Sequence, residues 1–204
     1  MVVARVAVLA CVGVLALTGC GDDGGSEAKT LTLDETPAAT ESGAATEPAD
    51  DGAIPEDPLD GEVARGTSVA ASPDEQAAAE VWFSYWTEVV RMYHDGEADR
   101  DALYALADRD AATGPLEYLE RMKSRGETQT GGVVAAISKI RVTGDEAVVE
   151  GCFRDTTVTL ARNGNPAETG LSFFTTKGTL VREGPDWRVV EANTTSENQE
   201  CDYR

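Results

Sequence analysis

The hydrophobic positions in the middle of the chain follow the spacing of an amphipathic helix. Large apolar side chains recur every three or four residues, with polar residues between them, at Trp82, Trp86, Val89, Val90 and Tyr93. Ser72, Pro73 and Glu75 form the sequence pattern of a capping box with proline in the first turn. Gly96 is a typical helix stop. The spacing therefore predicts one long helix over residues 73 to 95 that lies on a large apolar surface.

Two shorter helical patterns follow. The first covers residues 101 to 107, and the second covers residues 115 to 125 with Pro115 in its first turn and Gly126 after its end. Their apolar positions recur at helical spacing, at Leu103, Leu106, Leu116, Leu119 and Met122. We expect both helices to pack beside the long one.

After Gly132 the pattern becomes strand-like. Runs rich in β-branched residues are separated by short turn sequences, which is typical of antiparallel hairpins. The runs cover residues 133 to 142, 147 to 162, 171 to 183 and 187 to 194, and the second is long enough to be bent or bulged at Gly151. Helices followed by strands predict an α+β domain with the helices on one face of a curved antiparallel sheet.

The first twenty residues have the pattern of a secretion signal. Arg5 precedes an apolar run over residues 6 to 17, shorter than the roughly 18 residues that a membrane-spanning helix needs. Leu17-Thr18-Gly19-Cys20 resembles a bacterial lipobox, which implies removal of residues 1 to 19 and attachment of diacylglycerol and a fatty acid such as palmitate at Cys20. Acyl chains would then hold the protein on the extracytoplasmic face of the cell membrane. An ordinary cleaved signal is the alternative.

Composition divides the rest of the chain into a tether and a domain. All aromatic residues lie between Trp82 and Tyr203, so the folded domain is expected over residues 73 to 204. Residues 20 to 72 are rich in Asp and Glu and predict a disordered, acidic tether. The net charge of −20 excludes nucleic acid as a partner. High Ala, Gly, Asp and Glu with few Lys favours an actinobacterial source.

The cysteines predict one disulfide. Cys11 leaves with the signal and Cys20 is acylated, so the mature domain keeps Cys152 and Cys201. An even pair outside the reducing cytoplasm is expected to be bonded. The bond would hold the end of the chain against the sheet.

The order of elements resembles a known fold family. A long aromatic helix, two short helices and four strands ending in GTLVREGPDWRVVEANT resemble the nuclear transport factor two-like cone, over residues 73 to 201. The segment AVVEGCFRD and the late Cys201 are similar to small actinobacterial lipoproteins of this fold. The resemblance implies a pocket between the long helix and the concave sheet.

The sequence carries little catalytic chemistry. It has no phosphate loop, dinucleotide motif, nucleophile elbow or zinc-protease motif, and no metal or cofactor is expected. His94 belongs to the last turn of the long helix, where an imidazolium interacts favourably with the helix dipole. Asp155 shares strand parity with Val149 and Phe153, and Glu191 shares parity with Trp187 and Val189, so either carboxylate is a candidate to enter a pocket.

Three hypotheses for function remain, and one of them is a structural accessory subunit that docks through the convex face of the sheet or through the helices. The preferred one is a non-catalytic binding module for an apolar small molecule, a lipid or another envelope protein, whose pocket is lined by Tyr85, Trp86, Tyr93, Phe153 and Trp187. The alternative is an isomerase-, cyclase- or hydrolase-type pocket enzyme in which Asp155 or Glu191 moves a proton and Tyr85 donates one.

Overall fold

A computed structural model describes residues 57–168 and 172–197, all within one compact unit, Glu47–Arg204. The signal, the acylation site and Cys201 lie outside the described residues. The elements are, in chain order, β1 (Val63–Ser68), α1 (Pro73–Asp95), α2 (Arg100–Leu106), α3 (Arg109–Arg125), β2 (Thr128–Thr130), β3 (Val133–Thr143), β4 (Glu146–Asp155), β5 (Val158–Leu160), β6 (Pro166–Glu168), β7 (Ser172–Glu183) and β8 (Asp186–Glu197).

The long helix forms as its sequence predicts. The Ser72 hydroxyl accepts a hydrogen bond from the Glu75 amide (3.2 Å), and the Glu75 carboxylate accepts one from the Ser72 amide (2.9 Å), which completes the capping box. Gly96 ends the helix with a left-handed φ of 69°. Because both ends are fixed by local interactions, the bounds of α1 could be predicted from the sequence.

The start of the third helix differs from the prediction. Asp108 caps α3 by accepting a hydrogen bond from the Ala111 amide (2.8 Å), so the helix begins six residues before Pro115. Pro115 therefore lies inside the helix, where it has no N–H to donate to the carbonyl of Ala111.

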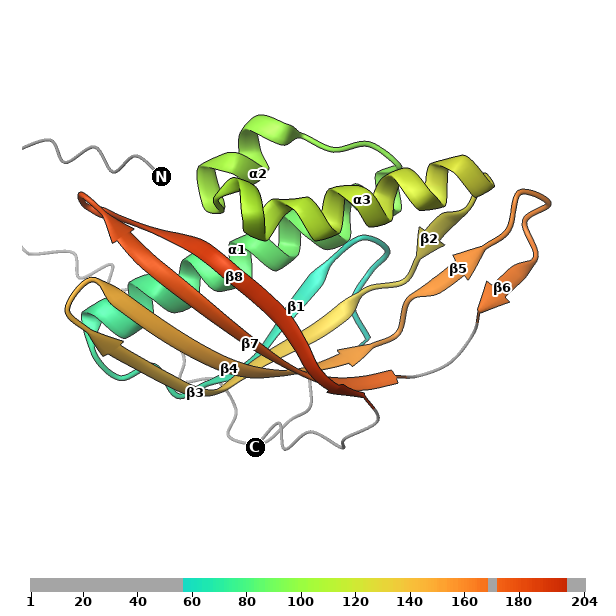
Figure 1. Ribbon diagram of the computed structural model, residues 1–204. Coiled ribbons are helices and arrows are strands. Elements are labelled where there is room, and N and C mark those ends of the chain that lie inside the picture. Colours follow the sequence, from blue (N-terminus) through green and yellow to red (C-terminus); the bar gives the residue numbers. More distant parts are fainter. Residues whose placement is uncertain (1–56, 169–171, 198–204) are drawn as a thin grey trace, which may run out of the picture. The chain divides into compact units, whose positions relative to one another are not determined.

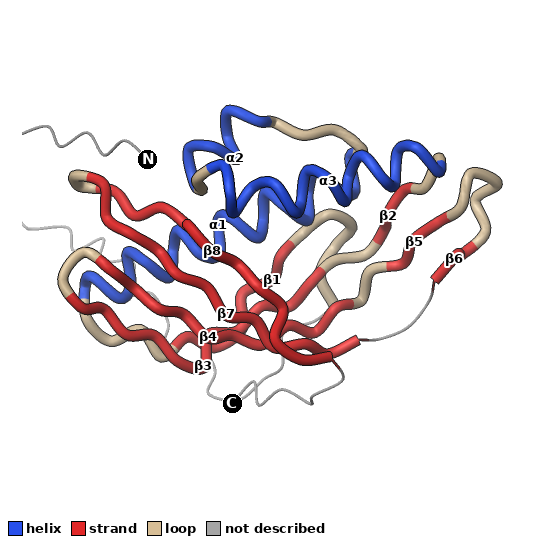
Figure 2. Tube along the Cα trace, in the orientation of Figure 1, coloured by secondary structure: helices blue, strands red, loops and turns tan. Residues whose placement is uncertain are grey.

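The strands form two sheets, and the three helices cover one face of the larger one (Figures 1 and 2). The larger sheet has the order β1-β3-β4-β7-β8 and the smaller one the order β2-β5-β6. All pairings are antiparallel except that of β1 with β3, which is parallel. The α+β class and the helices on a predominantly antiparallel sheet confirm the predicted fold class.

Two details of the strands correct the predictions. The expected run over residues 147 to 162 is two strands, β4 and β5, separated at Thr156 and Thr157 rather than bent at Gly151. The bulge near Gly151 belongs to the neighbouring strand β3, between Ile137 and Lys139. A Cβ at Gly151 would lie 2.7 Å from the Ala136 carbonyl oxygen, so close approach of the two backbones explains the glycine.

The domain begins earlier than residue 73. Strand β1 pairs with β3 from Val63 onward, and the Asp60 carboxylate accepts a hydrogen bond from the Gly131 amide (2.6 Å). The prediction of a disordered tether over residues 20 to 72 is therefore wrong for residues 60 to 68. The segment has no aromatic residue, and it is ordered by backbone hydrogen bonds to the sheet rather than by a large apolar side chain.

Helix α1 packs directly on the larger sheet where Trp82 contacts Gly178. Trp82 is fully buried, and a Cβ at Gly178 of β7 would lie 2.1 Å from its ring. No larger residue than glycine fits beneath this indole. Trp82 therefore fills the space between α1 and β7 at this position.

Candidate functional site

A cavity of about 250 Å³ lies beside the C-terminal half of α1. Its lining residues come from the region where the two sheets meet. In this region β2 leads into β3, and β4 leads into β5 (Figure 1). The wall comes from α1, α3, β2, β3, β4, β7 and the connection between β4 and β5. It consists of Trp86, Val89, Val90, Tyr93, Tyr118, Gln129, Val133, Phe153, Asp155, Thr157 and Phe174.

Glycine allows the two sheets to separate at this junction. Gly131 has a φ of 78°, which a residue with a side chain rarely adopts. A Cβ there would also lie 2.5 Å from the Thr156 carbonyl oxygen. The connection between β2 and β3 therefore requires glycine, and it places Gln129 and Val133 on the cavity wall.

Aromatic rings form most of the apolar wall. Trp86 meets Phe153 edge to face with centroids 4.8 Å apart, and Phe153 lies 5.2 Å from Phe174. Tyr93 and Tyr118 form a second pair at 4.9 Å. Burial raises the pKa of Tyr93, so its hydroxyl stays protonated. Such rings offer large apolar faces to a ligand.

The polar part of the wall is a short chain of hydrogen bonds. The Gln129 amide nitrogen donates to the Thr157 hydroxyl (3.1 Å), and the Thr157 backbone N–H donates to one carboxylate oxygen of Asp155 (2.7 Å). These bonds fix three side chains from β2, β4 and the connection to β5. The result is one polar edge on a mainly apolar cavity.

One wall residue carries an unsatisfied donor. The indole N–H of Trp86 is buried and has no hydrogen-bond partner among the described residues. A buried unpaired donor destabilises a fold by about 1 to 3 kcal/mol. The indole N–H of Trp82, in the core, is likewise without a partner among the described residues, so this feature is not confined to the cavity.

The structure brings four of the predicted site residues together. Trp86, Tyr93 and Phe153 line the cavity, and Asp155 lies at its polar edge. Because β4 carries no bulge of its own, Asp155 keeps the parity of Phe153, as the alternation of the strand predicts.

Glu191 does not lie in the cavity. Across β7 and β8, Thr179 pairs with Glu191 while the next residue, Leu180, pairs with Val189, so a bulge at this point shifts the alternation. Val189 stays buried, whereas the Glu191 carboxylate is exposed and accepts a hydrogen bond from the Asn193 side chain (2.8 Å). The expectation that Glu191 faces the pocket is wrong because the bulge reverses its side.

Tyr85 and Trp187 are core residues rather than lining residues. The Tyr85 hydroxyl donates a hydrogen bond to the Ala111 carbonyl (3.0 Å), and burial, followed by the charge of Asp108, raises the pKa of this phenol. Trp187 packs under the Arg182 guanidinium, 4.5 Å from its ring centroid. Arg182 also pairs with Asp74 at the start of α1 (2.7 Å), far along the helix from the cavity.

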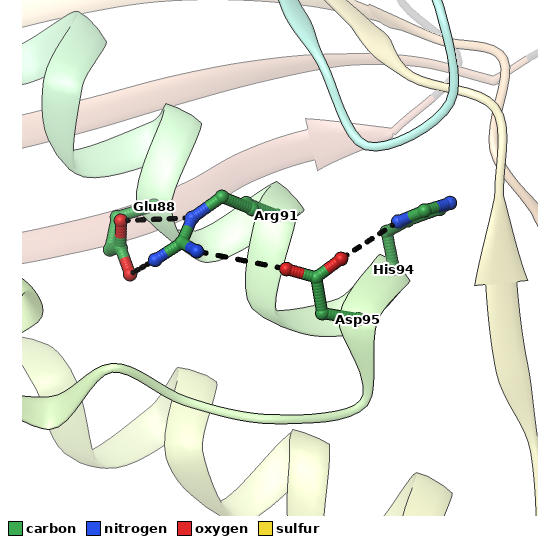
Figure 3. Close-up of polar contacts among 4 residues, drawn as sticks. All are labelled: Glu88, Arg91, His94 and Asp95. Carbon is green, nitrogen blue, oxygen red and sulfur yellow. Dashed lines mark hydrogen bonds and ion pairs between the residues drawn. The ribbon is translucent and has the colours of Figure 1, made fainter.

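His94 belongs to a charged group on α1 outside the cavity. Figure 3 shows the Arg91 guanidinium between the carboxylates of Glu88 and Asp95, and the His94 ring beside Asp95 (Nδ1 to Oδ1, 3.1 Å). None of these four residues lines the cavity. Their contacts with one another explain them as surface ion pairs of modest energy.

Several lining residues were not predicted. Tyr118 lies on α3, and Gln129 and Thr157 come from short strands or their ends, whose pairing has no sequence signal beyond scattered β-branched residues. The sequence alone does not decide whether Phe173 or Phe174 faces the cavity, because the side on which each residue of this strand lies cannot be assigned from the sequence. The structure places Phe174 in the cavity wall and packs Phe173 against Val134 on the opposite face of the sheet.

The described residues were searched for groups of metal ligands and for membrane-spanning helices. Across 57–168 and 172–197, no three His, Cys, Asp or Glu residues are grouped as metal ligands. In the same part of the chain, none of the helices has the length and apolarity to cross a bilayer.

Comparisons with known proteins support a statement about the fold and about nothing further. No family model matches the chain, and no curated protein matches it. The intermembrane space region of the chloroplast protein ARC6 superposes with a TM-score of 0.50 at 13% identity, over 61% of this chain and 98% of that chain. This likeness indicates a shared fold, in agreement with the predicted α+β cone.

Two further structures, both of bacterial proteins, superpose with lower TM-scores. A conserved protein from Planctomyces limnophilus DSM 3776 has a TM-score of 0.43 at 14% identity, over 60% of this chain and 98% of that chain. A proposed scytalone dehydratase from Novosphingobium aromaticivorans DSM 12444 has a TM-score of 0.38 at 15% identity, over 64% and 90% of the two chains.

Proposed function

We propose that this chain is a lipid-anchored, extracytoplasmic binding module that takes up a small, mainly apolar molecule. The observation that carries the proposal is the cavity between α1 and the junction of the two sheets, whose wall is aromatic and aliphatic with one polar edge. Binding pockets commonly combine such a wall with a few polar groups that orient the ligand.

The volume limits the ligand. Pockets for drug-sized ligands measure roughly 300 to 1,000 Å³, so a cavity of about 250 Å³ suits a smaller molecule. A two-chain phospholipid would have to leave its acyl chains outside. We therefore favour a small molecule over a whole lipid or a segment of another envelope protein.

The proposed location depends on the N-terminal sequence. A lipobox at Leu17–Cys20 supplies the anchor, and the acidic segment before Asp57 supplies a spacer between membrane and domain. A binding domain on such a spacer would meet ligands at the outer surface of the membrane.

The position of Asp155 at the cavity supports a second candidate function, that of a pocket enzyme. A carboxylate beside an apolar cavity can act as a general base, as a pocket enzyme of the isomerase, cyclase or hydrolase type would require. Such an enzyme would work without the two other predicted groups, because Tyr85 is bonded in the core and Glu191 is exposed.

The test compares a filled cavity with a matched control. Val90 lines the cavity, and Val148 lies on β4 with its side chain on the opposite face from Phe153. The full-length chain is purified from its own membranes as wild type, as Val90→Phe and as Val148→Phe, and each is studied by native mass spectrometry and extraction of bound small molecules.

We expect a copurifying small molecule in the wild type and in Val148→Phe, and its loss in Val90→Phe with the fold retained. The proposal is overturned if the wild type carries no molecule, or if Val90→Phe carries as much as the control. A molecule recovered in chemically altered form, with the change abolished by Asp155→Asn, would replace the binding module with the pocket enzyme.

A further inference from the structure

The charge and ring content of the cavity wall define a narrower class of ligand. Five of the eleven lining residues are aromatic, and Asp155 is the only charged residue among them. No Lys, Arg or His from the described parts of the chain lines the cavity. The wall therefore presents negative charge and π-faces with no opposing cation.

This combination matches one chemistry. The face of an aromatic ring carries negative potential and attracts a cation within about 6 Å of its centroid, and tryptophan does so most strongly. Trp86 lies next to Phe153, two positions before Asp155 on the same face of β4. A positively charged group in the cavity would therefore lie close to these aromatic rings and to a carboxylate.

The free hydrogen-bonding positions at the polar edge are acceptors. One oxygen of Asp155 accepts the Thr157 N–H, while no described residue donates to its second oxygen or to the carbonyl oxygen of Gln129. An ammonium group that carries hydrogens would donate to both. A quaternary ammonium would instead use charge and ring contact alone.

Resting on the binding function proposed above, we infer that the ligand is a small organic cation with an apolar or aromatic body. The positive group lies toward Asp155 and the ring faces, and the body lies against Val89, Val90 and Val133. The net charge of −20 adds a long-range field that draws cations toward the chain.

The positive charge of Arg121, next to the cavity, would repel a cationic ligand from the part of the wall beside it. The Arg121 guanidinium lies over the ring of Tyr118, 5.5 Å from its centroid, but Arg121 does not belong to the cavity wall. It occupies one aromatic face of the Tyr93–Tyr118 pair. The Trp86 and Phe153 side, next to Asp155, is therefore the expected position of the ligand's positive group.

A charged probe and its uncharged isostere test the inference. Benzyltrimethylammonium and neopentylbenzene have the same shape and differ in whether nitrogen or carbon stands at the quaternary centre. Their binding to the full-length chain is measured by calorimetry and by the intrinsic fluorescence of its three tryptophans. Asp155→Asn removes the carboxylate from the cavity, and Glu146→Gln removes one from the exposed opposite end of the same strand.

We expect the cation to bind roughly tenfold more tightly than the isostere, because ring faces and a carboxylate together favour the charge. That preference should be largely lost in Asp155→Asn and kept in Glu146→Gln, while Val90→Phe should abolish binding of both probes. Equal binding of the two probes overturns the inference but leaves the binding function standing. Failure of the cation to bind, or binding of the cation that survives Val90→Phe, also overturns the inference, while the binding function is decided by whether a small molecule copurifies with the wild type.

Discussion

The Tyr85 hydroxyl donates a hydrogen bond to the Ala111 carbonyl, the acceptor that Pro115 leaves without its helical partner. In a regular helix, the N–H four residues later would bond this carbonyl, but proline has none. A tyrosine from α1 thus replaces a missing backbone bond of α3. This role explains why Tyr85 is buried in the core and does not enter the cavity.

A double-mutant cycle tests this relationship. Tyr85→Phe leaves the Ala111 carbonyl buried and unpaired and should lower the free energy of unfolding by about 1 to 3 kcal/mol. In a Pro115→Ala background, the restored N–H bonds that carbonyl, so the same substitution should cost much less. Urea unfolding of the four proteins gives the coupling energy, and strictly additive effects would show that Pro115 and Tyr85 are independent.

Buried tyrosines predict a loss of stability at alkaline pH. The folded-state pKa values of Tyr85 and Tyr93 are raised by burial above the value of about 10 expected in the unfolded chain. The folded state then holds protons that the unfolded state loses, so stability is full below about pH 10 and falls as the pH rises further, by up to about 1.4 kcal/mol per pH unit for each group.

Urea unfolding between about pH 8 and about pH 11 measures this slope. Tyr85→Phe and Tyr93→Phe should each make the decline shallower, because each removes one group that titrates only on unfolding. A wild-type slope that neither variant changes would show that these phenols ionise in the folded state as easily as in the unfolded chain.

Two tryptophans one turn apart on α1 should differ in their contribution to stability. Trp82 is fully buried against Gly178, so Trp82→Ala should cost about 3 to 5 kcal/mol. Trp86 is half-buried beside a cavity, and Trp86→Ala should cost about 1 to 3 kcal/mol. Equal costs in denaturant melts would indicate that the cone is filled at Trp86 as well.

Sequence reasoning succeeded where the deciding interactions are local. The bounds of α1 follow from its cap and apolar spacing, and Asp155 was placed from the uninterrupted alternation of β4. Glu191 was misplaced because a single bulged residue reverses alternation and leaves no mark in the sequence. Strand β1 was missed because it pairs in parallel with a strand about seventy residues away.

The N-terminal anchor remains a prediction, since its residues lie outside those described. Cys20→Ser removes the acyl acceptor and should release the protein from membranes, whereas Cys11→Ser changes only the predicted signal and should leave it anchored. Detergent partitioning and membrane fractionation compare the two. Retention of the Cys20→Ser protein at the wild-type level would contradict lipid attachment at this residue.

The predicted disulfide is compatible with the register of the strands. Cys152 pairs with Thr175 of β7, and Thr175 pairs with Ser196 of β8, so Ser196 lies two strand spacings, roughly 10 Å, from Cys152. The five residues from Ser196 to Cys201 can extend to about 17 Å. The chain is therefore long enough to return across the sheet face to Cys152.

Closing this loop of 49 residues (201 − 152) should stabilise the domain by roughly 4 kcal/mol. Thiol labelling of the denatured, unreduced protein, mapped by mass spectrometry, should leave the peptides with Cys152 and Cys201 unmodified. Cys201→Ser should expose Cys152 to the label and lower the urea midpoint, because the unfolded chain regains the entropy of the open loop. Label on both cysteines of the unreduced wild type would rule out the bond.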